Sequence, residues 1–328
     1  MKILDIADLT VRFGGLTAVN DVSFSVADRE IVSLIGPNGA GKTTVFNAVT
    51  GIHEAASGDI RFSAKPISQA FDAKTGTNFV CVGLVTALLL TILVNLEPLW
   101  ETTITANYRF RQPFPWSKTV SSSFGYFAEK PVGRVLVPSL IGFVIGVAGA
   151  FAVWQRSRCA PEVSARCGIA RTFQNIRLFQ QMTVLDNVLI GMDTQLSTNF
   201  WHASIRLPRF WREHRQASQQ AMEILRFVGL AKESDQLAVN LSYGHQRRLE
   251  IARALAMKPR LLFLDEPAAG MNPAEARELM ALIQQIRNRG ITVLLIEHHM
   301  AVVMGISDRI VVLDHGEKIA EGTPAEVC

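Results

Sequence analysis

The chain has 328 residues, which is enough for one large or two ordinary domains with a sizeable core. Its formal net charge is only +4, and no run of Lys or Arg indicates a nucleic-acid surface. The four cysteines lack the spacing of a zinc site or a disulfide framework, so a reduced, cytosolic setting is expected. The N-terminus begins with an alternating strand pattern at residues 3–6 and shows no signal-peptide pattern.

Short apolar segments separated by turns predict the sheets. Strands are expected at residues 9–13, 22–26 and 31–35, and again at 260–264, 292–296 and 309–313. Each of the last three follows a helical stretch. That alternation predicts a mainly parallel α/β sheet with some antiparallel strands at its start.

One glycine-rich segment carries the strongest chemical signal. It fits the pattern G-x-x-x-x-G-K-[ST] and consists of Gly36, Pro37, Asn38, Gly39, Ala40, Gly41, Lys42, Thr43 and Thr44. A strand is expected before it, and residues 45–49 continue as a helix. Successive backbone N–H groups in such a loop form an anion-binding nest at a helix N-terminus. The segment predicts a nucleoside triphosphate site, with Lys42 on the β- and γ-phosphates and the Thr43 hydroxyl on Mg²⁺.

Two uncharged apolar runs interrupt this pattern, at residues 76–96 and 135–155. Each is close to the roughly 20 residues with which a helix spans a bilayer. Gly142, Gly146 and Ala150 give the second run a small-residue face for close helix packing. We therefore expect a transmembrane hairpin here. Basic residues are slightly more numerous on its outer flanks than in its loop, which predicts that the flanking regions lie inside.

Three alternatives to a spanning hairpin stay open at the level of the sequence. Both helices are buried in a soluble core, or they dock on membrane subunits without spanning, or the segment is an acquisition that folds poorly. A buried pair this long and apolar needs a large partner domain to cover it, so length and charge favour membrane insertion.

Another apolar strand, at residues 260–264, leads into two adjacent acids, Asp265 and Glu266. A buried strand that delivers a carboxylate at its end is how a P-loop enzyme holds Mg²⁺, here through Asp265. Glu266 is then placed to activate a water for attack on the γ-phosphate as general base.

A second phosphate-binding helix start is expected where the sequence reads Leu-Ser-Tyr-Gly-His-Gln, at residues 241–246. Ser242 is placed as the helix cap, and its hydroxyl and the Gly244 backbone suit phosphate. With these motifs in order, the chain outside the apolar runs resembles the ABC ATPases, the nucleotide-binding components of ABC transporters. The family's signature motif usually reads LSGGQ, so Tyr243 and His245 depart from it.

The resemblance implies roles for further residues. Gln174 is similar to the Q-loop glutamine, which senses Mg²⁺ and links the site to the membrane subunits. His298 resembles the switch histidine, which contacts the γ-phosphate and positions the attacking water. Phe13 resembles the aromatic residue that stacks on adenine. His299 and Asn272 each stand where relatives commonly have Asp.

A narrower resemblance is to the ATP-binding subunits of high-affinity branched-chain amino acid importers, and to close relatives for amides or urea. It rests on four stretches, FGGLTAVN from residue 13, GIARTFQNIRLF from 168, LSYGHQRRLEIARAL from 241 and LDEPAAGMNPAE from 264. The apolar insert and the stop at Cys328 depart from the pattern of this subgroup.

The expected fold is therefore a P-loop ABC ATPase domain of the α/β class. It combines a mainly parallel sheet, an antiparallel β subdomain and a helical subdomain at about residues 175–255. Residues 1–71 and 156–328 form this discontinuous domain, and the apolar helical hairpin interrupts it at 72–155.

The resemblance implies an ATPase that uses ATP and Mg²⁺ and closes as a head-to-tail dimer with a second ATP-binding subunit. Ser242 and Gly244 then act on the partner's nucleotide. Permease transmembrane subunits and, indirectly, a substrate-binding protein are the expected partners, at the cytoplasmic face of the inner membrane, with no nucleic acid. Two other classes stay open: a membrane-tethered ABC protein for export or anchoring, and a non-transport ABC ATPase acting on ribosomes or DNA.

Overall fold

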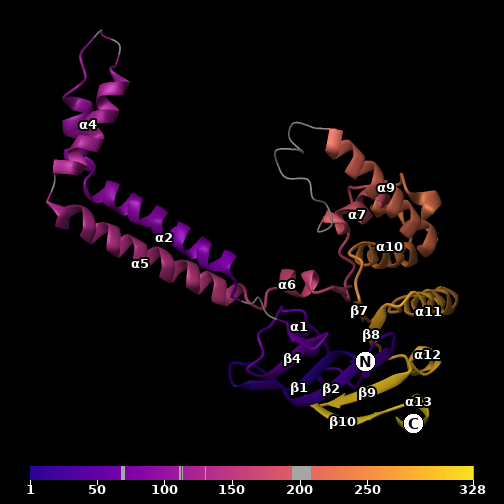
Figure 1. Cartoon of the computed structure of the whole chain (residues 1–328). Coiled ribbons are helices and arrows are strands. Elements are labelled where there is room, and N and C mark those ends of the chain that lie inside the picture. The colour runs from indigo at the N-terminus through magenta and orange to yellow at the C-terminus, as the bar shows by residue number, and fades with distance from the viewer. Residues whose placement is uncertain (68–70, 111, 113, 130, 194–207, 328) are drawn as a thin grey trace. The chain divides into compact units, whose positions relative to one another are not determined.

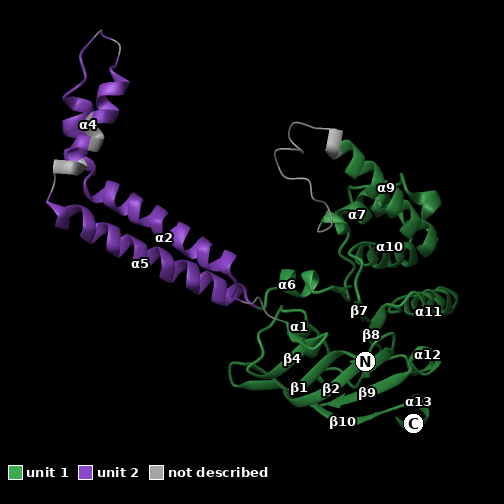
Figure 2. Cartoon of the chain, in the orientation of Figure 1, with its two compact units in different colours: residues 1–68, 159–328 green, residues 69–158 purple. Residues whose placement is uncertain are grey.

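The chain divides into two compact units. The structure, a computed structural model, describes residues 1–67, 71–110, 112, 114–129, 131–193 and 208–327. Met1–Ser68 and Cys159–Cys328 form the first unit, and Gln69–Arg158 form the second (Figure 2). These limits differ by a few residues at each end from the 72–155 insert expected from the sequence.

The first unit begins with an antiparallel sheet of four strands, in the order β2-β1-β4-β5. Its strands are β1 (Lys2–Phe13), β2 (Leu16–Ala27), β4 (Ser57–Phe62) and β5 (Lys65–Pro66). The segments expected at 9–13 and 22–26 are parts of the longer strands β1 and β2. The two long strands pair along their whole length, which makes this sheet a twisted β-ribbon with two short additions.

The larger sheet has six strands in the order β10-β9-β3-β8-β7-β6. They are β3 (Ile31–Ile35), β6 (Ile169–Arg171), β7 (Leu261–Asp265), β8 (Thr292–Ile296), β9 (Arg309–Asp314) and β10 (Glu317–Gly322). Neighbouring strands are parallel except for the antiparallel pair of β9 and β10. The prediction of a mainly parallel α/β sheet is confirmed. Every residue of β3, β7 and β8 is buried, as expected for strands covered on both faces.

Helices complete the first unit (Figure 1). They are α1 (Lys42–Val49), α6 (Pro161–Arg166), α7 (Val184–Gly191), α9 (Pro208–Val228), α10 (Tyr243–Ala256), α11 (Pro273–Asn288), α12 (Met300–Ile306) and α13 (Pro324–Val327), with 3₁₀ turns at Ala231–Glu233 and Ala238–Asn240. Helices α7, α9 and α10 pack on one another within the stretch expected to be a helical subdomain. Their buried side chains, among them Val188, Leu225 and Leu249, belong to a core that continues onto the six-stranded sheet.

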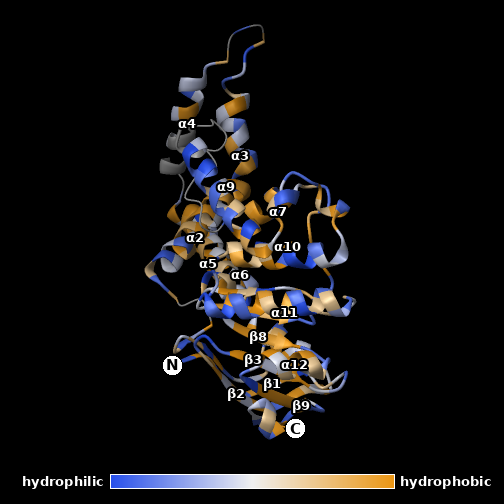
Figure 3. Cartoon of the chain, turned by 90° about the vertical axis from the view of Figure 1, so that its right-hand side faces the viewer, coloured by the Kyte–Doolittle hydropathy of each residue, from blue (hydrophilic) through white to orange (hydrophobic). Residues whose placement is uncertain are grey.

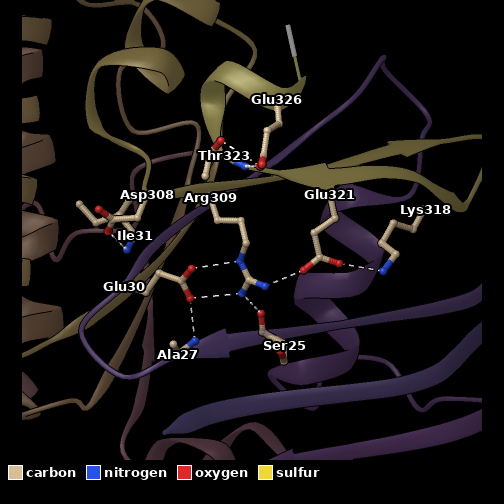
Figure 4. A network of polar contacts seen from close by, with 10 residues as sticks. All are labelled: Ser25, Ala27, Glu30, Ile31, Asp308, Arg309, Lys318, Glu321, Thr323 and Glu326. Carbon is tan, nitrogen blue, oxygen red and sulfur yellow. Dashed lines mark hydrogen bonds and ion pairs between the residues drawn. The ribbon is translucent and has the colours of Figure 1, made fainter.

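A second core joins the two sheets to α1. Phe46 of α1 and Phe263 of β7 are both fully buried and meet edge to face, with ring centroids 4.7 Å apart. Arg309 of β9 ties the sheets together at another place (Figure 4). Its guanidinium donates to Glu30 at 3.0 Å, to Glu321 of β10 at 2.7 Å and to the Ser25 carbonyl of β2. Because all three acceptors are fixed, the orientation of the β-ribbon on the sheet is defined.

The second unit is helical. Helix α2 (Ala73–Val94) pairs with α5 (Val132–Ser157), and between them lie α3 (Leu96–Trp100), a π-helical turn (Glu101–Thr105) and α4 (Trp116–Glu129). The helices expected at 76–96 and 135–155 are thus present with shifted ends. Asp72 caps α2 by accepting the Thr75 N–H at 2.8 Å. The helix therefore begins at Ala73, before the uncharged run that starts at residue 76.

Asn272, which stands where relatives commonly have Asp, starts α11 with a capping box. Its side-chain oxygen accepts the N–H groups of Ala274 and Glu275 at 2.9 Å, and the Glu275 carboxylate accepts the Asn272 N–H at 3.1 Å. The amide therefore replaces a carboxylate without loss of the cap.

Replacement Asn272→Ala removes the side-chain oxygen that accepts both N–H groups and should cost about 1 kcal/mol of stability. We expect the thermal midpoint of the full-length chain to fall by roughly 2–4 °C, measured by differential scanning fluorimetry. Asn288→Ala, at the exposed C-terminal end of the same helix, is the matched control and should leave the midpoint unchanged or slightly raised. Equal shifts in both variants would contradict the capping role.

Candidate functional site

The glycine-rich loop lies between β3 and α1, at the C-terminal edge of the six-stranded sheet (Figure 1). Two of its glycines cannot carry a side chain. A Cβ on Gly36, at φ 149°, would lie 2.0 Å from the Leu313 carbonyl oxygen, and one on Gly41, at φ 92°, would lie 2.7 Å from that of Ala18. The backbone of the loop therefore sits directly on its neighbours, and Gly41 leads straight into α1. Such a turn before a helix presents backbone N–H groups to an anion.

Lys42, the first residue of α1, folds back over this loop. Its ammonium donates to the carbonyl oxygens of Gly36 and Pro37, at 2.8 Å each. Burial lowers the pKa of Lys42, and the carboxylates of Glu266 and Asp265 act in the opposite direction. The loop thus keeps a cation at its centre, with two carbonyl groups that a phosphate can replace as acceptors.

Glu266, Gln174 and His298 are brought together although they come from three separate segments. Glu266 follows β7, His298 follows β8, and Gln174 follows β6. The Gln174 Nε2 donates to Glu266 Oε2 at 2.9 Å, and His298 Nδ1 lies 3.7 Å from Glu266 Oε1. Glu266 itself has φ 45°, in the left-handed region, and its N–H donates to the Ile296 carbonyl of β8. The strained backbone turns the carboxylate out of the strand towards its two partners.

Asp265 ends β7 beside this group and is only 2% exposed. Its carboxylate accepts a hydrogen bond from Arg171 of β6 at 3.0 Å, and Arg171 also donates to Asn47 at 2.6 Å and Thr50 at 3.2 Å. Burial raises the pKa of Asp265, whereas the hydrogen bond and charge of Arg171 lower it. Burial in turn lowers the pKa of Arg171. The ion pair therefore counteracts the tendency of this buried carboxyl to protonate.

The oxygen donors of this region fit magnesium. Thr43 in the first turn of α1, Asp265 and Gln174 offer hydroxyl, carboxylate and amide oxygens, the ligand types that Mg²⁺ prefers. Over the described residues, no group of three or more His, Cys, Asp or Glu side chains is gathered as a metal cage. A cation needs only a few protein ligands when phosphate oxygens supply the rest of its coordination shell.

Arg247 of α10 connects these segments and was not identified from the sequence. Its side chain is fully buried and donates to the carbonyl oxygens of Phe173 at 2.6 Å, Gln174 at 2.9 Å and Glu266 at 3.2 Å. Glu250, one helical turn on, accepts from Arg247 at 2.7 Å and from the Phe173 N–H at 3.2 Å. The spacing i, i+3 of Arg247 and Glu250 along α10 was the available signal. The Arg247–Glu250 pair holds the backbone of Gln174 and Glu266 in place.

Ser242 and Gly244 lie at the start of α10. The Ser242 hydroxyl accepts the His245 N–H at 3.4 Å and is exposed, which confirms a capped helix start. Between the described residues, no hydrogen bond or ion pair joins Ser242 or Gly244 to the glycine-rich loop of the same chain. Ser242 is exposed, whereas Gly244 is buried and a Cβ on it would lie 3.2 Å from Glu275 Oε1.

Phe13 and His299 sit at the margins of the site. Phe13 ends β1, is 44% exposed, and packs edge to face on His53 at a centroid distance of 5.0 Å. Its ring is accessible, as a base-stacking role requires. His299 precedes α12 without a side-chain capping bond, so the helix begins there without the cap that an Asp would give.

A parallel sheet that gathers a glycine-rich loop and two strand-end acids at one edge defines a P-loop nucleotide-binding domain. Comparison with known proteins narrows this class. The family model described as ABC transporter matches residues 19–109 and 149–269. The chain therefore belongs to the ABC transporter family.

Individual relatives agree with this family. The chain is 36% identical over 326 residues to the high-affinity branched-chain amino acid transport ATP-binding protein BraF of Pseudomonas aeruginosa, with 99% of this chain and 93% of BraF covered. The values for LivG of Escherichia coli K12, which carries the same description, are also 36%, 99% and 93%. Among solved structures, the ADP conformation of MJ1267, an ATP-binding cassette of an ABC transporter, aligns with a TM-score of 0.62 at 25% identity, covering 99% of this chain and 92% of that one.

Replacement Arg247→Met leaves the Glu250 carboxylate buried without its cation, and should cost about 3–5 kcal/mol of stability. It also frees the backbone under Gln174 and Glu266, so we expect ATP turnover to fall in the fraction that stays folded. The readouts are the thermal midpoint and steady-state phosphate release.

Arg248→Met is the matched control on the same helix. Arg248 pairs with Glu278, whose side chain is 67% exposed, so its loss should cost less than about 1 kcal/mol. Adding Glu250→Leu to Arg247→Met removes the orphaned charge and should recover part of the stability. Similar losses for Arg247→Met and Arg248→Met would contradict this assignment.

Proposed function

We propose that this ATPase drives the import of branched-chain amino acids through a membrane transporter. The substrate class is supported by 36% identity over 99% of the chain to BraF and LivG, whose descriptions name it. The observation that carries the catalytic part is the contact of Glu266 with both Gln174 and His298, next to the glycine-rich loop.

Binding of ATP relies on residues 36–44. The N–H groups of the loop and of the first turn of α1 receive the phosphates, and the Lys42 ammonium exchanges its two carbonyl acceptors for β- and γ-phosphate oxygens. Thr43, Asp265 and Gln174 would hold Mg²⁺, whose positive charge would offset the negative charge of the phosphates. Burial raises the pKa of Asp265, and the hydrogen bond and charge of Arg171 act against this effect in favour of the ionised carboxylate. Phe13 stacks on the adenine ring.

Glu266 acts as general base in the hydrolysis. Its carboxylate accepts a proton from the water that attacks the γ-phosphate, and the bond from Gln174 orients that carboxylate. His298, on the other carboxylate oxygen, positions the water and contacts the γ-phosphate. Burial of the surrounding strand ends keeps the reacting groups fixed in place.

The site of one chain is half of the working site. Ser242 and Gly244 contact the γ-phosphate bound to a second ATP-binding subunit in a head-to-tail dimer, a role that the exposed, capped start of α10 at Ser242 supports. ATP joins the two subunits and hydrolysis releases them, which moves permease subunits between inward- and outward-facing states. A substrate-binding protein delivers the amino acid, and the ATPase works on the cytoplasmic face of the membrane.

Replacement Glu266→Gln removes the base and keeps the shape of the side chain. We expect ATP turnover to fall by about 10²-fold or more, because general-base catalysis contributes 10²–10⁴-fold. Nucleotide affinity should be retained, as measured by equilibrium binding of a fluorescent ATP analogue. Glu278→Gln, on an exposed side chain, is the control with normal turnover. Undiminished turnover in Glu266→Gln would remove Glu266 from the role of base.

Mixing two inactive variants tests the shared site. Lys42→Ala disables the phosphate loop, and Ser242→Arg disables the contribution to the partner. A mixed dimer contains one site with both defects and one intact site, so an equal mixture should regain about a quarter of wild-type turnover. Each variant alone should stay inactive. If the mixture also stays inactive while mixed dimers form, both groups serve the nucleotide of their own chain.

A further inference from the structure

The second unit carries a surface that the ATPase reaction does not use. Helices α2 and α5 each contain an 18-residue window with a mean hydropathy of 2.3, and only 17% of each window is buried by this chain. Figure 3 shows both helices coloured mainly as hydrophobic. The core helix of a soluble protein has most of its surface covered, so these helices are built for another environment.

Small residues bring the two helices into close contact along one seam. A Cβ on Gly142 would lie 2.7 Å from the Ala87 Cα, and one on Gly83 would lie 2.8 Å from the ring of Phe143. At Gly146 the space is filled by the Thr86 hydroxyl, 2.0 Å from where a Cβ would be. Such backbone approach through small residues is how helices associate where water supplies no driving force.

The few hydroxyl groups of the hairpin all find partners within it. Residues 79–94 contain two hydroxyl side chains, Thr86 and Thr91, and residues 135–153 contain one, Ser139. Thr86 donates to the Gly142 carbonyl across the seam at 2.8 Å, and Thr91 lies 2.7 Å from Ser139. The hairpin thus leaves none of these hydroxyls in need of water, which is what a low-dielectric environment demands.

The outer side of both helices is apolar. Its exposed large side chains are Val80, Val82, Leu84, Val85, Leu88, Leu89, Leu93, Val94, Leu136, Val137, Leu140, Ile141, Val144, Ile145, Phe151 and Val153. Over residues 79–94 and 135–153, Thr91 is buried and Thr86 and Ser139 are half-buried, while Thr77, nearer the start of α2, is exposed. A partner that recognises polar groups therefore finds few groups to bond along the two apolar stretches. A hydrocarbon phase can cover both helices together, whereas a single protein partner covers one side.

Charged residues limit the apolar surface to the thickness of a bilayer. The uncharged stretch of α2 lies between Lys74 and Glu97, and that of α5 lies between Arg134 and Arg156. Each stretch is about 30 Å long at 1.5 Å per residue, which matches the hydrocarbon core of a membrane.

Aromatic rings gather where the hairpin joins the first unit. Phe71, Phe79 and Phe151 surround Trp154 at centroid distances of 5.5, 6.2 and 5.8 Å, and the Arg158 guanidinium lies 5.0 Å from that ring. Tryptophan beside a cation is typical of the interface between membrane and water.

We propose that α2 and α5 span a phospholipid bilayer as a preassembled hairpin, with lipid acyl chains as the partner of the outer surface. The N-terminus of α2 and the C-terminus of α5 both connect to the ATPase unit, so residues 97–134 lie on the opposite side of the membrane. This proposal goes beyond the transport function, because a subunit that energises a permease does not itself have to enter the bilayer.

The first test measures membrane insertion of the full-length chain in bacterial cells. Membranes are washed with alkaline carbonate, and the chain is expected in the pellet. Leu88→Arg combined with Leu140→Arg places charge on the lipid side and should shift most of the chain to the supernatant. Ser157→Arg, between two natural arginines, is the control that should stay in the pellet. Retained binding to ATP resin checks that every variant is folded.

Topology is measured on a chain with single cysteines and a maleimide that does not cross membranes. With only Ser117→Cys, in the segment between the helices, we expect labelling in intact spheroplasts. With only the natural, exposed Cys167 of the ATPase unit, labelling should require lysis. Carbonate release of the wild-type chain, or labelling of Ser117→Cys only after lysis, would overturn the proposal and indicate docking on a membrane protein. Both experiments measure membrane insertion and not ATP turnover. Either negative result would therefore overturn this proposal without counting against the proposed transport function.

Discussion

The catalytic arrangement depends on the hydrogen bonds and the ion pair of the buried Arg247 guanidinium. Its two terminal nitrogens donate to three carbonyl groups from two segments that are far apart in the sequence, and Glu250 is its counter-ion. The Arg247 Nε, also buried, has no hydrogen-bond partner. A buried charge is costly unless it is paired and hydrogen-bonded, so displacement of these carbonyl groups or of Glu250 is expected to destabilise the cluster. Because Arg247 lies on the helix that Ser242 caps, the same helix connects Ser242 to the backbone of Gln174 and Glu266.

The sheet supplies the second constraint. Parallel strands end at one edge, and three of them deliver Gln174, Glu266 and His298 to the same place. Glu266 was predicted from the apolar strand that precedes it, whereas Gln174 and His298 were identified through the resemblance to the ABC ATPases. The sequence did not predict Arg171, whose partner Asp265 lies 94 positions away, or the bonds of Arg247 to Phe173 and Gln174, 74 and 73 positions away. Local patterns carry no record of such distant pairs, and only the packed fold brings them together. The start of α2 was missed for another reason: the Asp72 cap is a local contact with Thr75, which hydropathy alone does not indicate.

The apolar insert enters the chain at a position that leaves the ATPase site intact. It leaves the first unit after the short edge strand β5 and returns before α6, so neither the phosphate loop nor the strand-end acids are interrupted. Long insertions at such surface connections cost little stability, since the closure penalty grows only slowly with loop length. An ATPase with an apolar hairpin can therefore keep its reaction and acquire its own contact with the membrane.

Completion of the site by a second chain is the central claim, and disulfide trapping measures it most directly. Asn38→Cys and Tyr243→Cys, both at exposed positions, are combined with Glu266→Gln in a chain whose natural cysteines are replaced by Ser. Oxidation with ATP present should give a covalent dimer on a non-reducing gel, and oxidation without nucleotide should give little. A dimer yield that does not depend on ATP, or a cross-link confined to the monomer band, would contradict the shared site.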